Sequence, residues 1–266
     1  MNIGILGGDL RQIHLYELLN SKKRHIDILY NRITKNECKS YNVIIMPLPI
    51  SKDGVHLFAP FSEEKPLLEN IFKENKQAYF LGGSISNETL EKAARQNVRI
   101  VDYYLDERLL EKNAKLTSDG AVELLKNDLN TTIKVLIIGF GRIGKALCKE
   151  LNDMSVNFCI TARKQSDYSK MEALGYQWTE TGKIKEVIND YNIVINTVPS
   201  LVLSEEELKN CKPDCKILDL ASAPYGTDFN FCDKKHITYN IAPGIPGKYY
   251  PKEAATAIYE TIKKLL

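Results

Sequence analysis

Short apolar runs alternate with longer amphipathic stretches along almost the whole chain. The runs end in Gly, Pro, Asn or Asp, which is typical of buried strands that turn into loops. The predicted strands cover residues 3–6, 26–30, 43–46, 78–81, 98–103, 134–138, 158–162, 177–179, 193–197, 217–220 and 237–241. Strands that alternate with helices in this way indicate parallel sheets covered on both faces, and therefore an α/β fold.

Apolar positions spaced three or four residues apart predict the helices between these strands. The predicted helices cover residues 10–20, 62–73, 87–96, 106–127, 142–151, 183–191, 204–211 and 252–266. Ser86 is the expected N-cap of the third helix. The fourth helix carries Gly120 as a weak point and is long enough to join two halves of the chain.

We expect two doubly wound parallel-sheet domains with a cleft between them. The first, residues 1–112, is expected to be a flavodoxin-like substrate domain, with the C-terminal helix 252–266 packed back on it. The second, residues 113–251, is expected to be a Rossmann NAD(P)-binding fold, because only this half carries the glycine spacing of that fold.

The strand predicted at 134–138 runs into a Gly-x-Gly-x-x-Gly turn that opens a helix. Gly139 permits the tight turn, Gly141 lets a pyrophosphate approach the backbone, and Gly144 lets the helix pack close to the strand. Free N–H groups at the start of the helix then face the phosphates. This context favours dinucleotide binding over an ordinary turn without a ligand. The residues assigned to this part of the cofactor site are Gly139, Phe140, Gly141, Arg142, Ile143 and Gly144.

The end of the next strand indicates which dinucleotide binds. An NAD-binding fold places an acid there, on the ribose 2′-hydroxyl. This chain has Thr161, Ala162, Arg163 and Lys164, with no acid until Asp167. An acid would repel a 2′-phosphate, whereas Arg163 can clamp one with two charge-assisted hydrogen bonds. These four residues are therefore assigned to the cofactor site, and NADP is favoured over NAD. The alternative is that the two cations belong to a solvated loop.

Composition and charge exclude several classes of protein. The 266 residues carry a formal net charge of +2, which gives no global electrostatic case for nucleic acid or an anionic membrane. No apolar run approaches the roughly 18 residues of a membrane span. The first residues enter a strand rather than a secretory leader, so the cytoplasm is the expected compartment. The 6 cysteines and 4 histidines show no zinc-ligand spacing, and we expect reduced thiols and no metal.

Ligands of open parallel sheets bind at the carboxyl ends of the strands, which makes the residues after each strand candidates. Asp9, Arg11 and Gln12 follow the first strand. The strand-end residues expected to edge the cofactor in the second half are Asn196, Thr197, Pro199 and Ser222. For any single strand end, a simple tight turn is the competing explanation.

Several segments together resemble the A subunit of dipicolinate synthase, over essentially the full length. They are Gly7-Gly8-Asp9-x-Arg11-Gln12, Pro47-Leu48-Pro49, Asn113-Ala114-x-Leu116-Thr117-Ser118-Asp119-Gly120-Ala121, Gly139-Phe140-Gly141-Arg142-x-Gly144, Thr161-Ala162-Arg163, Leu218-Asp219-Leu220-Ala221-Ser222 and Ala242-Pro243-Gly244-x-Pro246-Gly247-Lys248. The two-domain plan is more distantly similar to D-2-hydroxyacid dehydrogenases and S-adenosylhomocysteine hydrolase.

The resemblance implies formation of pyridine-2,6-dicarboxylate during sporulation, from a dihydro- or hydroxytetrahydro-dipicolinate of the lysine pathway. It implies that the partner is a flavoprotein-like B subunit, and that the location is the mother-cell cytoplasm of a sporulating bacterium. Whether the chain also forms a homodimer is left open.

A dicarboxylate substrate of this kind calls for cations and hydroxyl groups. Arg11 is the first candidate, because a guanidinium binds a carboxylate in bidentate fashion, and Lys248 is the second. Arg11 would otherwise be an ordinary surface residue of a helix. The candidate hydroxyl donors are Ser51, Thr117 and Ser118. The catalytic base is not assigned. Asp9 and Ser118 are candidates, and Asp9 would equally cap the helix that follows it.

Two departures from the similar families bear on function. Hydroxyacid dehydrogenases carry a Pro-His pair after the last Rossmann strand, where this chain has Pro243-Gly244, so their acid–base histidine cannot be carried over. The linker holds Asp119 where the dipicolinate family is expected to have Glu. We expect an NADP-dependent oxidoreductase that forms dipicolinate. One alternative is a non-catalytic NADP(H)-binding subunit. The other is a dehydrogenase of another small carboxylic acid, which the missing histidine disfavours.

Overall fold

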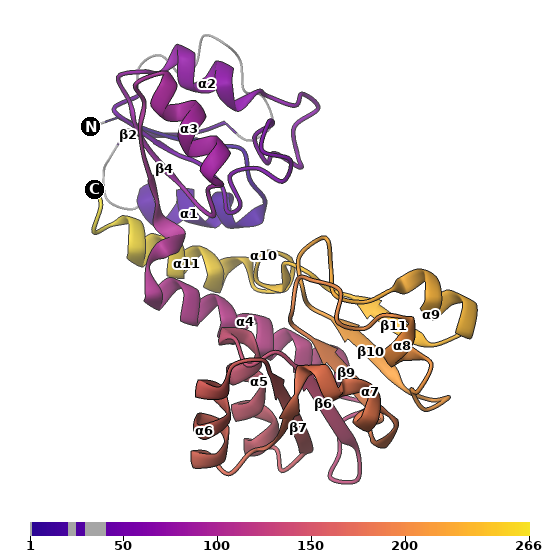
Figure 1. Ribbon diagram of the computed structural model, residues 1–266. Helices are drawn as coiled ribbons and strands as arrows, with labels where there is room; N and C mark the ends of the chain where they lie inside the picture. The colour runs from indigo at the N-terminus through magenta and orange to yellow at the C-terminus, as the bar shows by residue number, and fades with distance from the viewer. Residues whose placement is uncertain (1, 21–24, 30–40) are drawn as a thin grey trace. The chain divides into compact units, whose positions relative to one another are not determined.

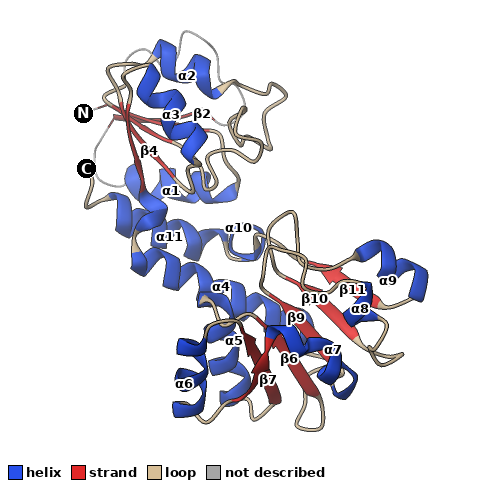
Figure 2. Cartoon of the chain, in the orientation of Figure 1, coloured by secondary structure: helices blue, strands red, loops and turns tan. Residues whose placement is uncertain are grey.

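The computed structural model describes residues 2–20, 25–29 and 41–266, and Figure 1 labels most of its helices and strands. The chain divides into two compact units, an N-terminal unit of Met1–Asn113 with Gly247–Leu266 and a C-terminal unit of Ala114–Pro246. Helices and strands alternate in both units (Figure 2). Cys38 and the last residue of the strand predicted at 26–30 lie outside the described residues. The assignment of one unit to the substrate and the other to the cofactor stays a prediction.

The N-terminal unit is built on a five-stranded parallel sheet in the order β2-β1-β3-β4-β5. Its strands are β1 (Asn2–Leu6), β2 (His25–Leu29), β3 (Val43–Ile45), β4 (Tyr79–Gly82) and β5 (Arg99–Asp102). Its helices are α1 (Leu10–Asn20), α2 (Leu68–Glu74), α3 (Asn87–Arg95), the 3₁₀ helix η2 (Tyr103–Leu105) and α11 (Pro251–Ile262). This strand order is the flavodoxin-like one.

The C-terminal helix α11 belongs to the core of the N-terminal unit. Its residues Ile258 and Ile262 pack with Leu15 of α1 and with Ile3 and Ile5 of β1, and α11 lies beside α1 in Figure 1. A second apolar cluster on the same sheet contains residues of β1, β3, β4 and α2. The continuous apolar run of β1 therefore follows from burial on both faces.

The C-terminal unit is built on a six-stranded parallel sheet in the order β11-β10-β9-β6-β7-β8. Its strands are β6 (Lys134–Ile138), β7 (Asn157–Ala162), β8 (Gln177–Glu180), β9 (Ile193–Asn196), β10 (Lys216–Asp219) and β11 (Thr238–Ile241). Its helices are α5 (Arg142–Asp153), α6 (Gln165–Ala173), η3 (Thr181–Lys183), α7 (Ile184–Val187), η4 (Ile188–Asp190), α8 (Glu205–Leu208) and α9 (Phe229–Lys235). Two further helices, α4 (Glu107–Leu125) and α10 (Ile245–Tyr249), contain the points at which the chain passes from one unit to the other. The structure confirms the predicted α/β class with two parallel sheets. In the second sheet, the first strand β6 lies in the middle, with β7 and β8 on one side and β9, β10 and β11 on the other, which is the Rossmann strand order.

The sequence prediction is wrong in extent for three helices, of which the one predicted at 204–211 is only the four-residue helix α8. The helix predicted at 62–73 begins only at Leu68, because Pro66 disfavours helical backbone at the residue before it. The helix predicted at 183–191 is instead a succession of η3, α7 and η4. The β-branched Val187 and Ile188 lower helix propensity at that break. Ser86 does cap α3, with its hydroxyl accepting the N–H of Thr89.

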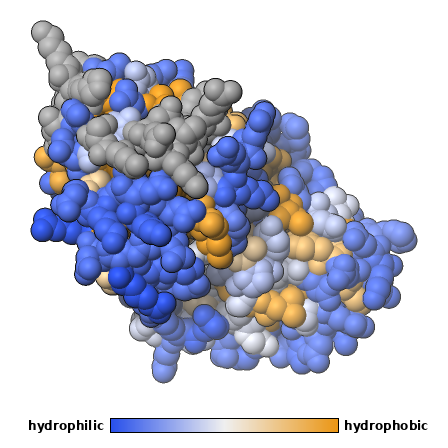
Figure 3. All heavy atoms as spheres, turned by 90° about the horizontal axis from the view of Figure 1, so that it is seen from above, coloured by the Kyte–Doolittle hydropathy of each residue, from blue (hydrophilic) through white to orange (hydrophobic). Residues whose placement is uncertain are grey.

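Hydrophilic side chains predominate on the face drawn in Figure 3, and apolar side chains gather there only in small patches. None of the helices in the described ranges is both long enough and apolar enough to cross a membrane.

Candidate functional site

The glycine-rich turn lies where β6 passes into α5, at the carboxyl edge of the six-stranded sheet. Gly139 has a φ of +100°, in the region that favours glycine. A Cβ on Gly144 would lie 1.9 Å from Gly139 O, so the turn and the helix touch backbone to backbone. A Cβ on Gly141 would meet nothing within 4 Å. The turn is thus closed between Gly139 and Gly144 and open over Gly141.

The start of α5 is suited to a phosphate group. Gly141 is the N-cap residue and provides no side-chain acceptor for the first turn of this helix of 12 residues. Backbone N–H groups at such a helix end, together with the helix dipole, attract negative charge. The residues present therefore fit the diphosphate of a dinucleotide. The contact between the backbones of Gly139 and Gly144 permits no side chain at Gly144, and the space over Gly141 is open for the phosphates.

The turn also lies where the strand order reverses, because β6 has β7 on one side and β9 on the other. A Cβ on Gly139 would lie 2.7 Å from Val198 Cγ2 and 2.8 Å from Thr197 Oγ1. The Thr197 hydroxyl donates to Ile138 O at 2.8 Å. The buried Asn196 amide both donates to and accepts from the backbone of Val198, at 3.0 Å each. Asn196 and Thr197 therefore hold the segment after β9 against the turn.

The end of β7 supports the turn from the other side. The N–H of Gly139 lies 3.2 Å from Thr161 O and 3.3 Å from Thr161 Oγ1. Thr161 and Ala162 are both buried. Pro199 and Ser222, the other residues expected to edge the cofactor, are exposed at their strand ends. Their contacts with a cofactor stay predictions.

Two exposed cations, Arg163 and Lys164, follow β7 directly. No carboxylate of the described residues forms an ion pair with Arg163. The first acid after the strand, Asp167, lies 3.6 Å from Lys170 and not beside Arg163. The guanidinium therefore has its full hydrogen-bonding capacity for an anion.

A stacked aromatic pair stands beside this strand end. The rings of Tyr168 and Trp178 are 4.3 Å apart and 8° from parallel, and the Tyr168 hydroxyl lies 3.4 Å from Ala162 O. Trp178 is the single tryptophan of the chain. The tryptophan fluorescence of the protein therefore comes from one residue, which stacks on a tyrosine beside this strand end.

The sequence interpretation missed the role of Asp219 at the end of β10. Its carboxylate is fully buried and accepts hydrogen bonds from Ala221 N at 2.9 Å, Gly226 N at 3.2 Å and Thr227 Oγ1 at 2.7 Å. It therefore holds the loop 221–227, which carries Ser222. The only signal in the sequence was an acid at a strand end.

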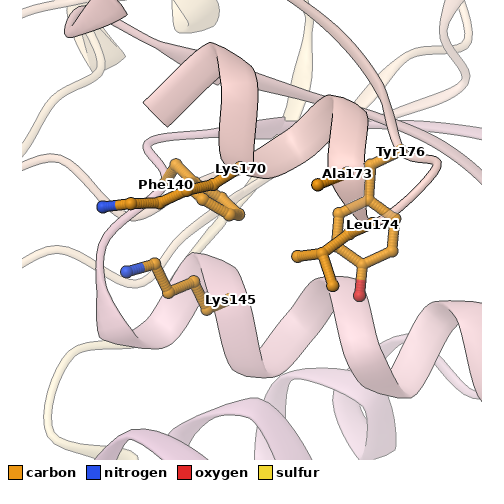
Figure 4. A pocket seen from close by; sticks show the side chains of 6 residues that line it. All are labelled: Phe140, Lys145, Lys170, Ala173, Leu174 and Tyr176. Carbon is orange, nitrogen blue, oxygen red and sulfur yellow. The ribbon is translucent and has the colours of Figure 1, made fainter. Parts of the chain in front are cut away.

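A pocket of about 380 Å³ lies between α5 and α6, next to the glycine-rich turn (Figure 4). It is lined by Phe140, Lys145, Lys170, Ala173, Leu174 and Tyr176. The amines of Lys145 and Lys170 extend to the same side of it in Figure 4, and Lys145 Nζ lies 5.1 Å from the centre of the Phe140 ring. The Phe140 ring thus lines this pocket, and its contact with a cofactor stays a prediction.

A charged cluster joins α4 to α5. Lys115 Nζ donates to Asp119 and, at 2.7 Å, to Glu150 Oε1. Burial and a hydrogen bond with Asp119 raise the pKa of Glu150 to about 7. Burial opposes ionisation of Asp119 as well, but hydrogen bonds with Glu150 and Lys115 keep its pKa below the usual range. Thr117 and Ser118, on the same helix, are buried, and Ser118 Oγ has no partner among the described residues. Their contacts with substrate stay predictions.

The predicted residues at the start of α1 form a cluster at the carboxyl edge of the five-stranded sheet. Arg11 Nε and Nη2 donate to the two carboxylate oxygens of Asp9 at 2.8 Å each, and Nη2 also donates to Leu48 O. Asp9 also caps α1 by accepting the N–H of Arg11 at 3.1 Å. The backbone of Gly247 covers the pair, since a Cβ there would lie 2.8 Å from Asp9 Oδ2. Arg11 Nη1 has no hydrogen-bond partner within the described part of the chain.

Ser51 lines a polar pocket of about 260 Å³ beside the start of α3. Its hydroxyl lies 2.6 Å from His56 O and accepts the N–H of Gly54 at 3.0 Å. Ser51 therefore organises its own turn, while Lys248, on α10, is exposed. Contacts of either residue with a substrate stay predictions.

The part of the chain that the structure describes contains free thiols and no cluster of metal-ligand side chains. No group of three His, Cys, Asp or Glu side chains there could hold a metal ion. The cysteines Cys148, Cys159, Cys211, Cys215 and Cys232 are free thiols. Burial raises the pKa of Cys148 to about 12, which makes that thiol unreactive at neutral pH.

Two family models match the chain. The N-terminal domain of the dipicolinate synthase A subunit matches residues 2–104. The NAD-binding domain of D-isomer specific 2-hydroxyacid dehydrogenases matches residues 83–225. The second match contains the glycine-rich turn and both strand ends that support it.

Relatives with these names cover nearly the whole chain. The A subunit of dipicolinate synthase from Bacillus subtilis (strain 168) is 28% identical over 284 aligned residues, which include 100% of this chain and 96% of that protein. The crystal structure of the A subunit of dipicolinate synthase from Bacillus halodurans superposes with a TM-score of 0.88 at 22% identity, over 99% of this chain and 97% of that one. Apo D-lactate dehydrogenase from Escherichia coli superposes with a TM-score of 0.68 at 12% identity, over 100% and 96% of the two chains. The two structural likenesses show the shared fold.

Proposed function

Because the chain belongs to the family of dipicolinate synthase A subunits and carries an NAD-binding domain of the 2-hydroxyacid dehydrogenase type, we propose that it forms pyridine-2,6-dicarboxylate by an NADP-dependent oxidation. The substrate is a dihydrodipicolinate or its hydroxytetrahydro precursor. The proposal is carried by the glycine-rich turn, which is open over Gly141 and closed at Gly144. Arg163 follows the neighbouring strand β7, and no described carboxylate forms an ion pair with it.

The chain's own groups define the cofactor site of this proposal. The N–H groups at the start of α5 hold the diphosphate, and Gly139 and Gly144 keep the backbone close enough to permit it. Arg163, with Lys164 beside it, binds the 2′-phosphate, and the strand end carries no acid to bind the 2′-hydroxyl of NAD. NADP, when bound, supplies the acceptor for a hydride.

The substrate loses a hydride and a proton as its ring becomes aromatic, and the hydroxytetrahydro precursor loses water as well. Arg11 and Lys248 supply positive charge for the carboxylates, and Ser51, Thr117 and Ser118 supply hydroxyl groups. Asp9 is an unfavourable base, because both its oxygens are bonded to Arg11. Aromatisation acidifies the departing proton, so the reaction does not depend on a strong base.

The similarity to a protein named as an A subunit supports action with a B subunit, which we propose to be flavoprotein-like, in the mother-cell cytoplasm of a sporulating bacterium. A non-catalytic NADP(H)-binding subunit is the second candidate. It is favoured by the Pro243-Gly244 sequence at the end of the Rossmann sheet, where hydroxyacid dehydrogenases carry a catalytic histidine.

Absorbance of reduced nicotinamide tests the proposal. Purified protein is mixed with freshly prepared dihydrodipicolinate and NADP, with and without the partner subunit. We expect reduction of NADP together with formation of pyridine-2,6-dicarboxylate. The absence of reduction under both conditions would favour the non-catalytic candidate. Arg11→Met is expected to raise the KM for substrate, and an unchanged KM would remove Arg11 from carboxylate binding.

A further inference from the structure

The strand order of the N-terminal unit reverses at the carboxyl ends of β1 and β3, and open α/β sheets bind their ligands at such a position. Residues that follow the two strands meet there. Arg11 Nη2 donates to Leu48 O. A Cβ on Gly8 would lie 3.1 Å from Gln12 Cδ and 3.1 Å from Pro47 Cβ. The side chains of Arg11 and Gln12 therefore both lie at the point where open α/β sheets bind their ligands.

Gln12 stands out there because its amide is buried without a partner. The residue is 1% exposed, and Nε2 has no hydrogen bond to any described residue. Native proteins satisfy nearly all buried donors, because an unsatisfied one costs folding free energy. An apolar side chain in the first turn of α1 would avoid that cost. The amide therefore lacks an acceptor among the described residues.

Two other amides of the same unit, one buried (Asn75) and one partly buried (Gln96), also have a buried oxygen without a partner but differ from Gln12 in their nitrogen. Asn75 has an unpartnered Oδ1, but its Nδ2 donates to Ile71 O at 2.8 Å. Gln96 has an unpartnered Oε1, but its Nε2 donates to Glu69 O at 3.2 Å. Each of these amides has a structural bond that explains its presence, whereas Gln12 Nε2 has none among the described residues.

We propose that Gln12 is a substrate-positioning residue whose Nε2 donates to a carboxylate of the planar dicarboxylate, beside the Nη1 group of Arg11. The inference rests on the proposed function for the identity of the ligand. Asp9 already neutralises much of the Arg11 charge, so further neutral donors are needed to bind a carboxylate with its several acceptor sites. A donor shielded from water makes a stronger hydrogen bond than an exposed one.

Gln12→Met tests this proposal, because methionine has a similar volume and cannot donate. The urea midpoint of the variant should be no lower than that of the wild type, since a buried unpaired amide is removed. Its dissociation constant for pyridine-2,6-dicarboxylate, measured by calorimetry, should rise on the order of tenfold. Gln12→Glu should weaken binding further, because its charge repels the ligand. NADP affinity should not change in either variant. Gln96→Met is the matched control and should bind the dicarboxylate as the wild type does.

Two results would overturn the proposal. One is wild-type dicarboxylate affinity in Gln12→Met, and the other is a wild-type protein that does not bind the dicarboxylate. A lowered urea midpoint with unchanged binding would assign the amide to a buried water instead. The two proposals can also fail separately. If Gln12→Met binds the dicarboxylate more weakly but the wild-type protein cannot reduce NADP, the proposed oxidation is contradicted and the role of Gln12 in binding is supported.

Discussion

The open space over Gly141 allows the cofactor site to be tested separately from folding. In Gly141→Ala the new methyl group meets nothing within 4 Å, and the φ of −76° suits any residue. Alanine is less favourable than glycine at an N-cap by up to about 1 kcal/mol, and the reduced entropy of the unfolded chain offsets a similar amount. The free energy of unfolding should therefore be nearly unchanged.

The same methyl group occupies the space that we assign to the diphosphate. It would displace a phosphate oxygen from the N–H groups at the start of α5. A hydrogen bond to a charged group contributes about 1.5–3 kcal/mol, and each 1.4 kcal/mol corresponds to about tenfold in affinity. The dissociation constant for NADPH should therefore rise by roughly 10- to 150-fold for each bond that is lost.

Two further variants complete the experiment. Gly144→Ala places a Cβ 1.9 Å from Gly139 O, so both stability and affinity should fall. Gly182→Ala adds a Cβ that also meets nothing within 4 Å but lies after β8, and both quantities should be retained. Quenching of Trp178 fluorescence by NADPH measures affinity, and thermal unfolding followed by circular dichroism measures stability. Wild-type affinity in a folded Gly141→Ala variant would refute the assignment of the diphosphate to this turn.

Three other predictions follow from single side chains. Arg163→Ala should weaken NADP binding on the order of tenfold and leave NAD binding nearly unchanged, because only NADP carries the 2′-phosphate. Calorimetric titrations measure both affinities. An equal loss of affinity for NADP and for NAD would contradict the assignment of Arg163 to the 2′-phosphate. Asp219→Asn should lower the free energy of unfolding by about 2–3 kcal/mol, because an amide nitrogen cannot accept the hydrogen bonds that the buried carboxylate accepts. An unchanged urea midpoint would contradict this. The pKa of Glu150, raised from 4.5 to about 7, means that the folded protein keeps a proton that the unfolded chain has lost, so stability should fall as pH rises between these values. Glu150→Gln should reduce that fall by on the order of 1 kcal/mol in urea titrations at about pH 5 and pH 8, and an unaltered pH dependence would count against the shifted pKa.

The sheets and the glycine-rich turn could be predicted because they depend on local pattern. The strands are apolar over residues 3–6 and 135–138, since helices cover both faces of each sheet, and this pattern does not depend on the sequence of the loops. Gly139 and Gly144 could be placed because a positive φ and a backbone contact each require glycine. A spacing of glycines therefore specifies a geometry almost without tertiary context.

The finer parts of the site depend on contacts between distant segments. Arg11 was expected to be free for a carboxylate, but most of its donors are bonded to Asp9 and to Leu48 O, a residue 37 positions away. Asp219 fastens a loop through donors that belong to the following turn. Whether Gln12 is buried without a partner depends on how the segment after β3 packs. Periodicity and motif spacing contain no information on such packing.

A calorimetric titration of the wild-type chain with NADP, and separately with NAD, measures whether the glycine-rich turn and Arg163 together form an NADP site. We expect NADP to bind with a stoichiometry of one per chain and at least tenfold more tightly than NAD, on the order of the contribution of one charge-assisted contact. Heat from neither cofactor, or tighter binding of NAD, would contradict it.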